Sequence, residues 1–397
     1  MDSIRMITCI KEGVLADALL EDGHLKELSL IPKEQSSILS NIYIGKVKNI
    51  AKNIQAAFVE IENGLLCYLP FKEIKNPIYT RQKKQERLTE GDELLVQVSR
   101  EAVKTKAPSV TTNLNLTGKY LVMTTGNRMV GYSARLKSED KTRLKEQVEA
   151  WDLPPAGLIV RTNAARADFE ELTFECEKLC QQYRFLTEQA IHRAVHSCVM
   201  KSRPSYLTSI LGTRSENLKE ILTDDLELYE QIREFLTEEM PKDVEKLRLY
   251  EDCHFPLKAL YRLEKGLSDA LSARVWLKSG AYLVIEPTEA LTVIDVNTGK
   301  YTGGKDKQAA VLKINREAAK EIARQLRLRN LSGIILVDFI DMDQAEEKEE
   351  LLALMRELLK KDPMKAAAVD LTELGLMELT RKKQKKTLME QAKECGL

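Results

Sequence analysis

Two short apolar runs, each ending in an acidic residue, constrain the fold of this chain most strongly. Residues 291–295 read LTVID and residues 334–338 read IILVD. Apolar runs of this length are typical of strands buried on both faces of an α/β sheet, in which ligands bind beyond the carboxyl ends of the strands. We therefore expect Asp295 and Asp338 to emerge at the edge of a sheet, with Asp341 close behind.

Two carboxylates at neighbouring strand ends can share a divalent cation. Mg²⁺ prefers oxygen ligands and keeps water molecules that can be activated for hydrolysis. The residues alone leave a second interpretation open, in which each aspartate caps the next helix or accepts hydrogen bonds from turn amides.

The charge balance gives no global signal for a nucleic-acid partner. The chain of 397 residues has 61 Lys and Arg against 61 Asp and Glu, so RNA contacts must depend on local patches. One such patch is residues 291–330, with nine basic residues against four acidic ones. The N-terminus resembles neither a signal nor an anchor, and no apolar run approaches the ~18 residues of a membrane helix. These features predict a folded cytoplasmic protein without a transmembrane segment.

Two motif-like patterns are misleading. The spacing of Cys176, Cys180, His192 and His196 resembles that of zinc-finger ligands. The surrounding segment predicts one continuous helix, which would separate Cys176 from His196 by ~30 Å, so no zinc site is expected. Residues 299–305 resemble a phosphate-binding loop, but Asp306 follows where Ser or Thr is needed to bind Mg²⁺, which disfavours nucleotide binding.

The pattern of strands and helices divides the chain into five regions. The first (1–35) predicts strand, turn and strand, and the second (36–119) predicts short strands typical of a small barrel. The third (120–206) predicts strands at YLVMTT and GLIVRT, a helix over 137–151, and the long helix described above. The fourth (207–272) mixes helices with short strands, and the last (273–397) alternates strands and helices.

Four stretches make the chain resemble the ribonuclease E/G family. They are NIYIGKVKNIAKNIQAAFVEI (41–61), GLIVRT (157–162), IDVNTG (294–299) and IARQLRLRNLSGIILVDFIDM (322–342). Members of this family are endoribonucleases that cleave single-stranded RNA in mRNA decay and in the processing of rRNA and tRNA precursors. The resemblance implies an α+β multidomain fold, with the following parts: an RNase H-like subdomain in two pieces (1–35 and 207–272), an inserted S1 RNA-binding domain of the OB-type β-barrel class (36–119), a 5′-sensor domain (120–206) and a DNase I-like α/β catalytic subdomain (273–397).

The resemblance also assigns the catalytic residues. It implies that Asp295 and Asp338 bind one catalytic Mg²⁺ and that Asn297 forms a hydrogen bond at the scissile phosphate. The expected products have a 5′ phosphate and a 3′ hydroxyl. Because Asn297 is two residues after Asp295, both side chains lie on one face of the strand, which fits these roles.

The RNA-binding residues follow from the same resemblance. Phe58 and Tyr68 fall at S1 positions whose aromatic rings stack on bases, and Lys106 matches a lysine near the RNA path. The residues alone also allow both rings to be core aromatics of the barrel. Arg324, Arg327 and Arg329 cannot share one helix face, so we expect some of them to be solvated or paired within the protein.

A second set matches the 5′-phosphate site of the family. Arg161 and Thr162 are placed to bind a 5′ monophosphate, and Gly118 and Val122 fall where backbone groups contribute. The pattern is incomplete, because Ala134 stands where relatives often have another Arg. A strand arginine paired with a helix carboxylate is the alternative.

The C-terminal sequence departs from the family pattern. Family members generally continue into a CPxC motif, whose cysteines bind zinc together with those of a partner chain, and then into a small domain. Here the lone Cys395 cannot supply half of a four-thiolate site. We therefore expect no zinc, and a homo-oligomer, if formed, without a zinc link. The alternative to an endoribonuclease is a non-catalytic S1-domain RNA-binding protein. Single-stranded RNA is the expected partner in both cases.

Overall fold

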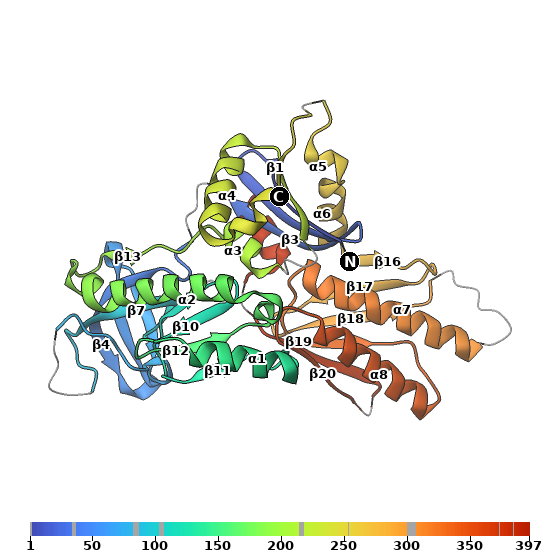
Figure 1. The fold of residues 1–397 in the computed structure, drawn as a ribbon. Helices are drawn as coiled ribbons and strands as arrows, with labels where there is room; N and C mark the ends of the chain where they lie inside the picture. The colour runs from blue at the N-terminus through green and yellow to red at the C-terminus, as the bar shows by residue number, and fades with distance from the viewer. Residues whose placement is uncertain are drawn as a thin grey trace. The chain divides into compact units, whose positions relative to one another are not determined.

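The computed structural model describes residues 2–33, 37–81, 87–102, 107–213, 218–252, 254–299, 307–372, 374–383 and 385–397. The chain forms two compact units. Unit 1 contains Met1–Gln35, Glu216–Arg233 and Glu245–Leu397, and unit 2 contains Ser36–Ser215 and Glu234–Val244. Figure 1 shows the strands and helices of both units. The five-part division expected from the sequence is finer than these two units and stays a prediction.

The first sheet of unit 1 has five strands in the order β15-β14-β1-β2-β3. Their bounds are β1 Ser3–Lys11, β2 Val14–Glu21, β3 His24–Pro32, β14 Leu218–Thr223 and β15 Leu247–Leu249. The predicted turn before His24 joins β2 to β3, and a second hairpin at Gly13, whose φ is +74°, adds the unpredicted β1. A buried ion pair between Arg5 and Asp17, 2.7 Å apart, joins β1 to β2.

Short helices cover the apolar face of this sheet. They are α5 (Leu257–Leu260), α6 (Leu263–Leu271) and α9 (Leu388–Glu394). A further helix, α4, spans Leu226–Glu239. Leu257, Leu267 and Leu388 pack into one core with strand residues such as Met6 and Leu28. The helix α9 begins at a capping box between Thr387 and Glu390, which satisfies free backbone amides of its first turn.

The second sheet of unit 1 positions the predicted catalytic residues. Its strand order is β16-β17-β18-β19-β21-β20. The bounds are β16 Arg274–Trp276, β17 Tyr282–Pro287, β18 Leu291–Asn297, β19 Gly333–Asp338, β20 Ala366–Leu371 and β21 Leu376–Arg381, with helices α7 Lys307–Leu328 and α8 Ala345–Lys360. Both helices pack on one face of the sheet (Figure 1), where Ile294, Ile335 and Val337 contact Ile314 and Met355 in a single core.

The expectation that these strands are buried on both faces is wrong. Only β18 and β19 pair in parallel, whereas β17–β18 and β19–β21 are antiparallel. In such a mixed sheet one face can stay in solvent. On the face opposite the helices, Val293 is 37% exposed and Ile334 is 52% exposed.

The first part of unit 2 is the predicted small barrel. Its strands are β4 Ile42–Ala51, β5 Ala56–Glu60, β6 Leu66–Pro70, β7 Glu93–Arg100 and β8 Ser109–Thr111, with β13 Cys198–Met200 added at the edge. Pairing of β4 with both β5 and β7 closes the barrel. Gly45 is required in β4, because a Cβ there would lie 2.4 Å from Val59 Cγ1 and 3.0 Å from Val96 Cγ2.

The second part of unit 2 is a four-stranded sheet in the order β11-β12-β10-β9. The strands are β9 Asn115–Thr117, β10 Leu121–Thr124, β11 Val130–Tyr132 and β12 Gly157–Val160, and the helices are α1 Ser138–Glu149, α2 Phe169–Arg184 and α3 Ser205–Gly212. The predicted strands at YLVMTT and GLIVRT and the helix at 137–151 are confirmed. The predicted continuous helix is too long: α2 passes through a π-helical turn and a 3₁₀ turn that ends at His192. His196 lies outside it, with φ +68°.

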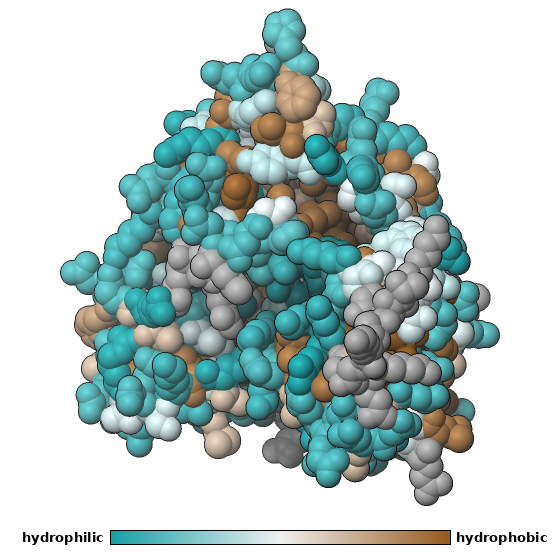
Figure 2. Space-filling view, turned by 90° about the vertical axis from the view of Figure 1, so that its right-hand side faces the viewer, coloured by the Kyte–Doolittle hydropathy of each residue, from teal (hydrophilic) through white to brown (hydrophobic). Residues whose placement is uncertain are grey.

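Figure 2 shows one face of the molecule, on which hydrophilic residues predominate and hydrophobic ones are scattered. In the part of the chain that the structure describes, no helix is both long enough and apolar enough to cross a bilayer.

Candidate active site

Asp295 and Asp338 lie at the same level on two neighbouring parallel strands: Asp338 is the last residue of β19, and Asp295 is two residues before the end of β18. The strands β18 and β19 pair so that Asp295 is directly opposite Asp338, and adjacent strands are ~4.8 Å apart. Along β18, Ile294 and Val296 point into the core and are buried. Because side chains alternate along a strand, Asp295 points to the opposite face, away from α7 and α8. The two carboxylates are therefore neighbours, as predicted, but they lie on the open face of the sheet and not beyond the ends of both strands.

The electrostatics of this pair fit a cation. Partial burial, followed by the negative charges of Asp295 and Asp341, raises the pKa of Asp338 above its ordinary value. Two ionised carboxylates this close repel each other, and a divalent cation relieves that repulsion. In the described ranges no group of three or more His, Cys, Asp and Glu side chains is arranged to bind a metal. Mg²⁺ needs fewer protein ligands than that, because it usually keeps several waters and takes one or two carboxylates.

Asn297 lies beside the carboxylate pair, as its position in the strand predicts. Its Nδ2 donates a hydrogen bond to Oδ2 of Asp295 over 2.7 Å. The side chains of Asp295 and Asn297 are both half-buried on the same face of β18. The amide therefore fixes the orientation of the carboxylate and lies within reach of any group bound there.

Sequence reasoning missed Asn315, a residue of α7 that positions the segment after Asp338. Its side chain is fully buried. Nδ2 donates to the carbonyl oxygen of Ile340 at 2.8 Å, and Oδ1 accepts from the backbone N–H of Ile340 at 3.2 Å. These bonds attach the segment that follows Asp338 to α7, the helix that underlies the sheet. In the sequence Asn315 looks like an ordinary polar helix residue, and its burial is seen only in the structure.

The arginines of the basic helix are engaged within unit 1, as expected for some of them. Arg324 donates to the carboxylate of Glu321 and to the carbonyl of Leu25. Arg327 forms ion pairs with Glu21 at 3.1 Å and with Glu27 at 2.9 Å.

The third arginine, Arg329, donates to the side chain of Gln325 and to the carbonyl of Ser272. Burial lowers its pKa to about 10. All three side chains thus connect α7 to neighbouring parts of unit 1. The phosphate-loop pattern that precedes it lies mostly outside the described residues.

Phe58 and Tyr68 face each other across β5 and β6 on the outside of the barrel. They are cross-strand partners with ring centroids 6.1 Å apart in an edge-to-face arrangement. Both rings are half-buried, whereas their neighbours Val59, Cys67 and Leu69 fill the barrel core. The core-aromatic interpretation is therefore wrong, and their role in RNA binding stays a prediction. Lys106 lies outside the described residues.

The structure brings the four predicted 5′-phosphate residues together in unit 2. Val122 is opposite Ile159 in the β10–β12 pair, which places it beside the end of β12. Arg161 follows β12, and its Nη1 donates to the carbonyl of Gly118 at 2.5 Å. The hydroxyl of Thr162 lies 2.9 Å from that of Ser133.

The alternative for Arg161 was an ion pair with a helix carboxylate. A helix carboxylate, Glu175, influences the pKa of Arg161, but the two side chains form no ion pair. Glu175 of α2 accepts hydrogen bonds from the backbone amides of Lys119, Tyr120 and Leu121 at 2.7–2.9 Å. Burial lowers the pKa of Arg161, and the charge of Glu175 acts in the opposite direction. Gly118 is required here because a Cβ would lie 2.3 Å from Oε1 of Glu175. The carboxylate thus shapes the loop, and no ion pair between Arg161 and a carboxylate is found among the described residues.

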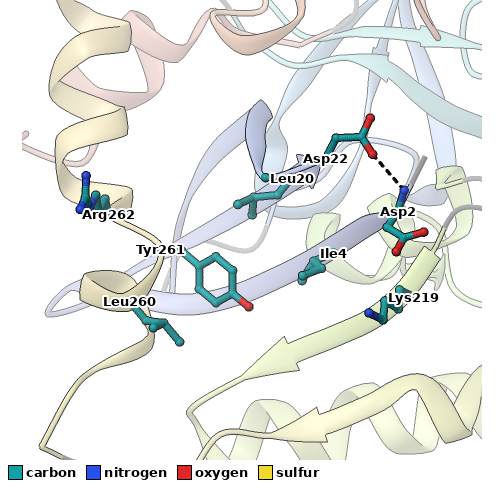
Figure 3. Close-up of a pocket in the computed structure, with 9 residues that line it drawn as sticks. Asp2, Ile4, Leu20, Asp22, Lys219, Leu260, Tyr261 and Arg262 are labelled. Atoms are coloured by element: carbon teal, nitrogen blue, oxygen red, sulfur yellow. Dashed lines mark hydrogen bonds between the residues drawn. The ribbon is translucent and has the colours of Figure 1, made fainter.

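A separate cavity of about 330 Å³ lies in unit 1 between β1, β2, β14 and the α5–α6 connection (Figure 3). Tyr261 and Leu260 line one side, Lys219 lines another, and Asp22 accepts a hydrogen bond from the backbone N–H of Asp2 at 3.2 Å. None of the predicted site residues lines this cavity. The carboxylate pair lies on another sheet, on the face opposite the buried Ile294 and Val337.

Comparison with known proteins agrees with this geometry. The profile of the S1 RNA binding domain matches residues 40–113, which include the barrel, and that of the ribonuclease E/G family matches residues 115–384. The chain therefore combines an S1 RNA-binding domain with a ribonuclease domain in an α+β multidomain fold.

Relatives that match nearly the whole chain show which family within this class it belongs to. Ribonuclease G of Haemophilus influenzae is 34% identical over 403 residues, which cover 98% of this chain and 81% of that protein. Ribonuclease G of Escherichia coli K12 is 32% identical over 393 residues, covering 94% and 78%. Ribonuclease E of Synechocystis is 34% identical over 386 residues, covering 92% and 56%. The chain belongs to the ribonuclease E/G family.

Proposed function

We propose that this endoribonuclease hydrolyses single-stranded RNA with the help of one Mg²⁺ ion bound by Asp295 and Asp338. The observation that supports this most strongly is the direct pairing of Asp295 of β18 with Asp338 of β19, with Asn297 on the same face. We propose rRNA precursors, tRNA precursors and mRNA as substrates, with products that have a 5′ phosphate and a 3′ hydroxyl. The cytoplasm is the compartment in which such RNA occurs.

The roles of the residues follow from their positions. When bound, Mg²⁺ supplies an activated water and neutralises charge on the phosphate. Asp295 and Asp338 bind the ion through oxygen atoms, and Asn297 holds the orientation of Asp295 while its amide donates to a phosphate oxygen. Asp341 adds negative charge beside the pair and so strengthens the attraction for a cation.

RNA binding away from the cleaved bond belongs to unit 2. Phe58 and Tyr68 offer two half-exposed rings on which bases stack without dependence on sequence. Lys106, which lies outside the described residues, is proposed to contribute a positive charge to RNA binding. The guanidinium of Arg161, whose Nη1 donates to the carbonyl of Gly118, offers its positive charge to an anion. With Thr162 and the backbone around Gly118 and Val122, it forms a site for a 5′ monophosphate.

The finer fold assignments are also proposals. The five-stranded sheet of unit 1 with α5 and α6 corresponds to an RNase H-like subdomain, and the sheet that contains β18 and β19 corresponds to a DNase I-like subdomain.

Cleavage of a defined RNA tests the proposal. A 5′-monophosphorylated A/U-rich oligonucleotide is incubated with the purified protein in Mg²⁺ or in EDTA, beside the same sequence with a 5′ hydroxyl. We expect Mg²⁺-dependent internal cleavage, faster for the monophosphorylated RNA. Binding without cleavage in any divalent cation would favour the non-catalytic S1-domain protein, and equal rates for both 5′ ends would remove the sensor assignment alone.

A further inference from the structure

An exposed aromatic pair lies on the same sheet face as the carboxylate pair. Trp276 of the edge strand β16 is opposite Tyr282 of β17, and Tyr282 is opposite Asn297 of β18. Directly opposed residues in antiparallel strands point to the same face, so these three side chains form one row across the sheet. The next row contains Arg274, Val284, Asp295 and Asp338. Two strand spacings of ~4.8 Å place Trp276 about 10 Å from Asn297.

The two rings and one guanidinium form a compact group, which we name the aromatic platform: Trp276, Tyr282 and Arg274. The ring centroids of Trp276 and Tyr282 are 5.1 Å apart. The guanidinium carbon of Arg274 lies 4.6 Å from the centroid of Tyr282 and 5.8 Å from that of Trp276. Among the described residues Arg274 has no acidic group within ion-pair distance, so its positive charge is not neutralised by a neighbouring carboxylate.

Folding alone does not account for this group. Trp276 is 59% exposed, and the helices α7 and α8 pack on the other face of the sheet. Cross-strand aromatic pairs stabilise a sheet modestly, and a charged residue on an edge strand prevents unwanted pairing. Neither effect requires a large indole ring in solvent beside the residues that face the scissile phosphate.

We propose that the aromatic platform is a base-binding subsite in which a nucleobase next to the cleaved bond stacks on Trp276 and Tyr282. This inference rests on the proposed function, because it takes the occupant to be the single-stranded RNA cleaved at Asp295 and Asp338. Base stacking on aromatic rings tolerates every base, and an arginine beside the rings attracts the adjoining phosphate. The platform therefore fixes the RNA at the catalytic sheet, whereas Phe58 and Tyr68 bind it in the other unit.

Oligonucleotides that lack one base test the position of the subsite. A series of RNAs with a single abasic residue at successive positions around the cleaved bond is cut by the wild type, Trp276→Ala, Trp276→Phe and Phe255→Ala. Phe255 is a matched control, since it is an aromatic residue of unit 1 that is 49% exposed. We expect kcat/KM of the wild type to fall about 5- to 150-fold, the ratio for one lost stacking contact, at one flanking position. Trp276→Ala shows a similar loss on intact RNA and no further loss at that abasic position.

A binding measurement separates this inference from the proposed function. The chain has two tryptophans, so a Trp151→Phe background leaves Trp276 as the only indole. In the cleavage-site variant Asp295→Asn with Asp338→Asn, we expect bound RNA to quench this fluorescence, and an RNA abasic at the identified position to quench it less. Absence of cleavage by the wild type with quenching intact would overturn the proposed function and leave the subsite.

Three results would overturn the subsite itself. The first is cleavage by Trp276→Ala that matches Phe255→Ala on every RNA of the series. The second is an abasic penalty that stays undiminished in Trp276→Ala, because the base then stacks elsewhere. The third is a light-scattering change from dimer to monomer in Trp276→Ala with an unchanged abasic profile, since the face would then be an interface between two copies of the chain. Retention of activity by Trp276→Phe distinguishes stacking from a folding defect.

Discussion

Replacement of Asn315 by Leu is expected to affect both the stability of unit 1 and the position of the segment that follows Asp338. Leucine has nearly the same shape as asparagine but cannot form the two hydrogen bonds to Ile340. The backbone N–H and C=O of Ile340 then lose their partners in a partly buried position, and each unsatisfied group costs about 1–3 kcal/mol. Because Ile340 is only half-buried, we expect the lower part of the summed range, a loss of about 2–4 kcal/mol in the free energy of unfolding.

The same change should lower catalysis more than RNA binding. The segment that follows Asp338 is released from α7, and a misplacement of about 1 Å at a catalytic group can cost ~100-fold in rate. Urea denaturation gives the unfolding free energy, and cleavage kinetics give kcat and KM. The control is Arg316→Gln, one residue further along α7, which removes only an exposed ion pair with Glu350 and should cost less than about 1 kcal/mol. If Asn315→Leu behaved like this control in both assays, the positioning role of Asn315 would be refuted.

Three other predictions follow from particular contacts. Gly118→Ala forces a Cβ into the carboxylate of Glu175. This change should abolish the faster cleavage of 5′-monophosphorylated RNA and leave cleavage of 5′-hydroxyl RNA intact. An unchanged ratio of the two cleavage rates would contradict this prediction. Phe58→Ala should weaken binding of single-stranded RNA by about 1–3 kcal/mol, the scale of one stacking contact, as measured by fluorescence anisotropy, with the circular dichroism spectrum unchanged. Burial alone would raise the pKa of Glu27, but the positive charges of Arg5 and Arg327 outweigh this effect and hold the pKa below the ordinary 4.5. The ionised carboxylate therefore stabilises the fold above pH 4.5. This stabilisation is lost as the pH falls through the lowered pKa. The difference in unfolding free energy between wild type and Glu27→Gln should therefore shrink as urea titrations move below pH 4.5, and a difference independent of pH would show that the charge of Glu27 is not involved.

The parts of the fold that could be predicted are those with a strong local pattern. The apolar runs before Asp295 and Asp338 define strands, and because side chains alternate along a strand, Asn297 falls on the same face as Asp295. The alternating short strands of the barrel and the helix at 137–151 were predictable for the same reason. The motif resemblance added the assignment of the S1 and ribonuclease domains, which the residue pattern alone did not provide.

The missed features depend on contacts between distant parts of the chain. Hydropathy cannot tell a strand buried on both faces from one with an open face, so the exposure of Ile334 was not predicted. The end of the helix at His192 follows a π-helical turn without a Gly or Pro signal. Asn315 looks like an ordinary polar helix residue until its partner, 25 positions away, is known. Likewise, the row of Trp276, Tyr282 and Asn297 requires the register of three strands.

The paired carboxylates are tested most directly by single-turnover cleavage of a 5′-monophosphorylated single-stranded RNA with the double variant Asp295→Asn, Asp338→Asn. The variant keeps the shape of both side chains but removes both negative charges. RNA affinity is measured by fluorescence anisotropy on the same preparation. We predict that Mg²⁺-dependent cleavage is lost while the RNA affinity stays within a few-fold of the wild type. Cleavage by the double variant at a rate close to that of the wild type would contradict the account, because the bond would then be cut without these two carboxylates.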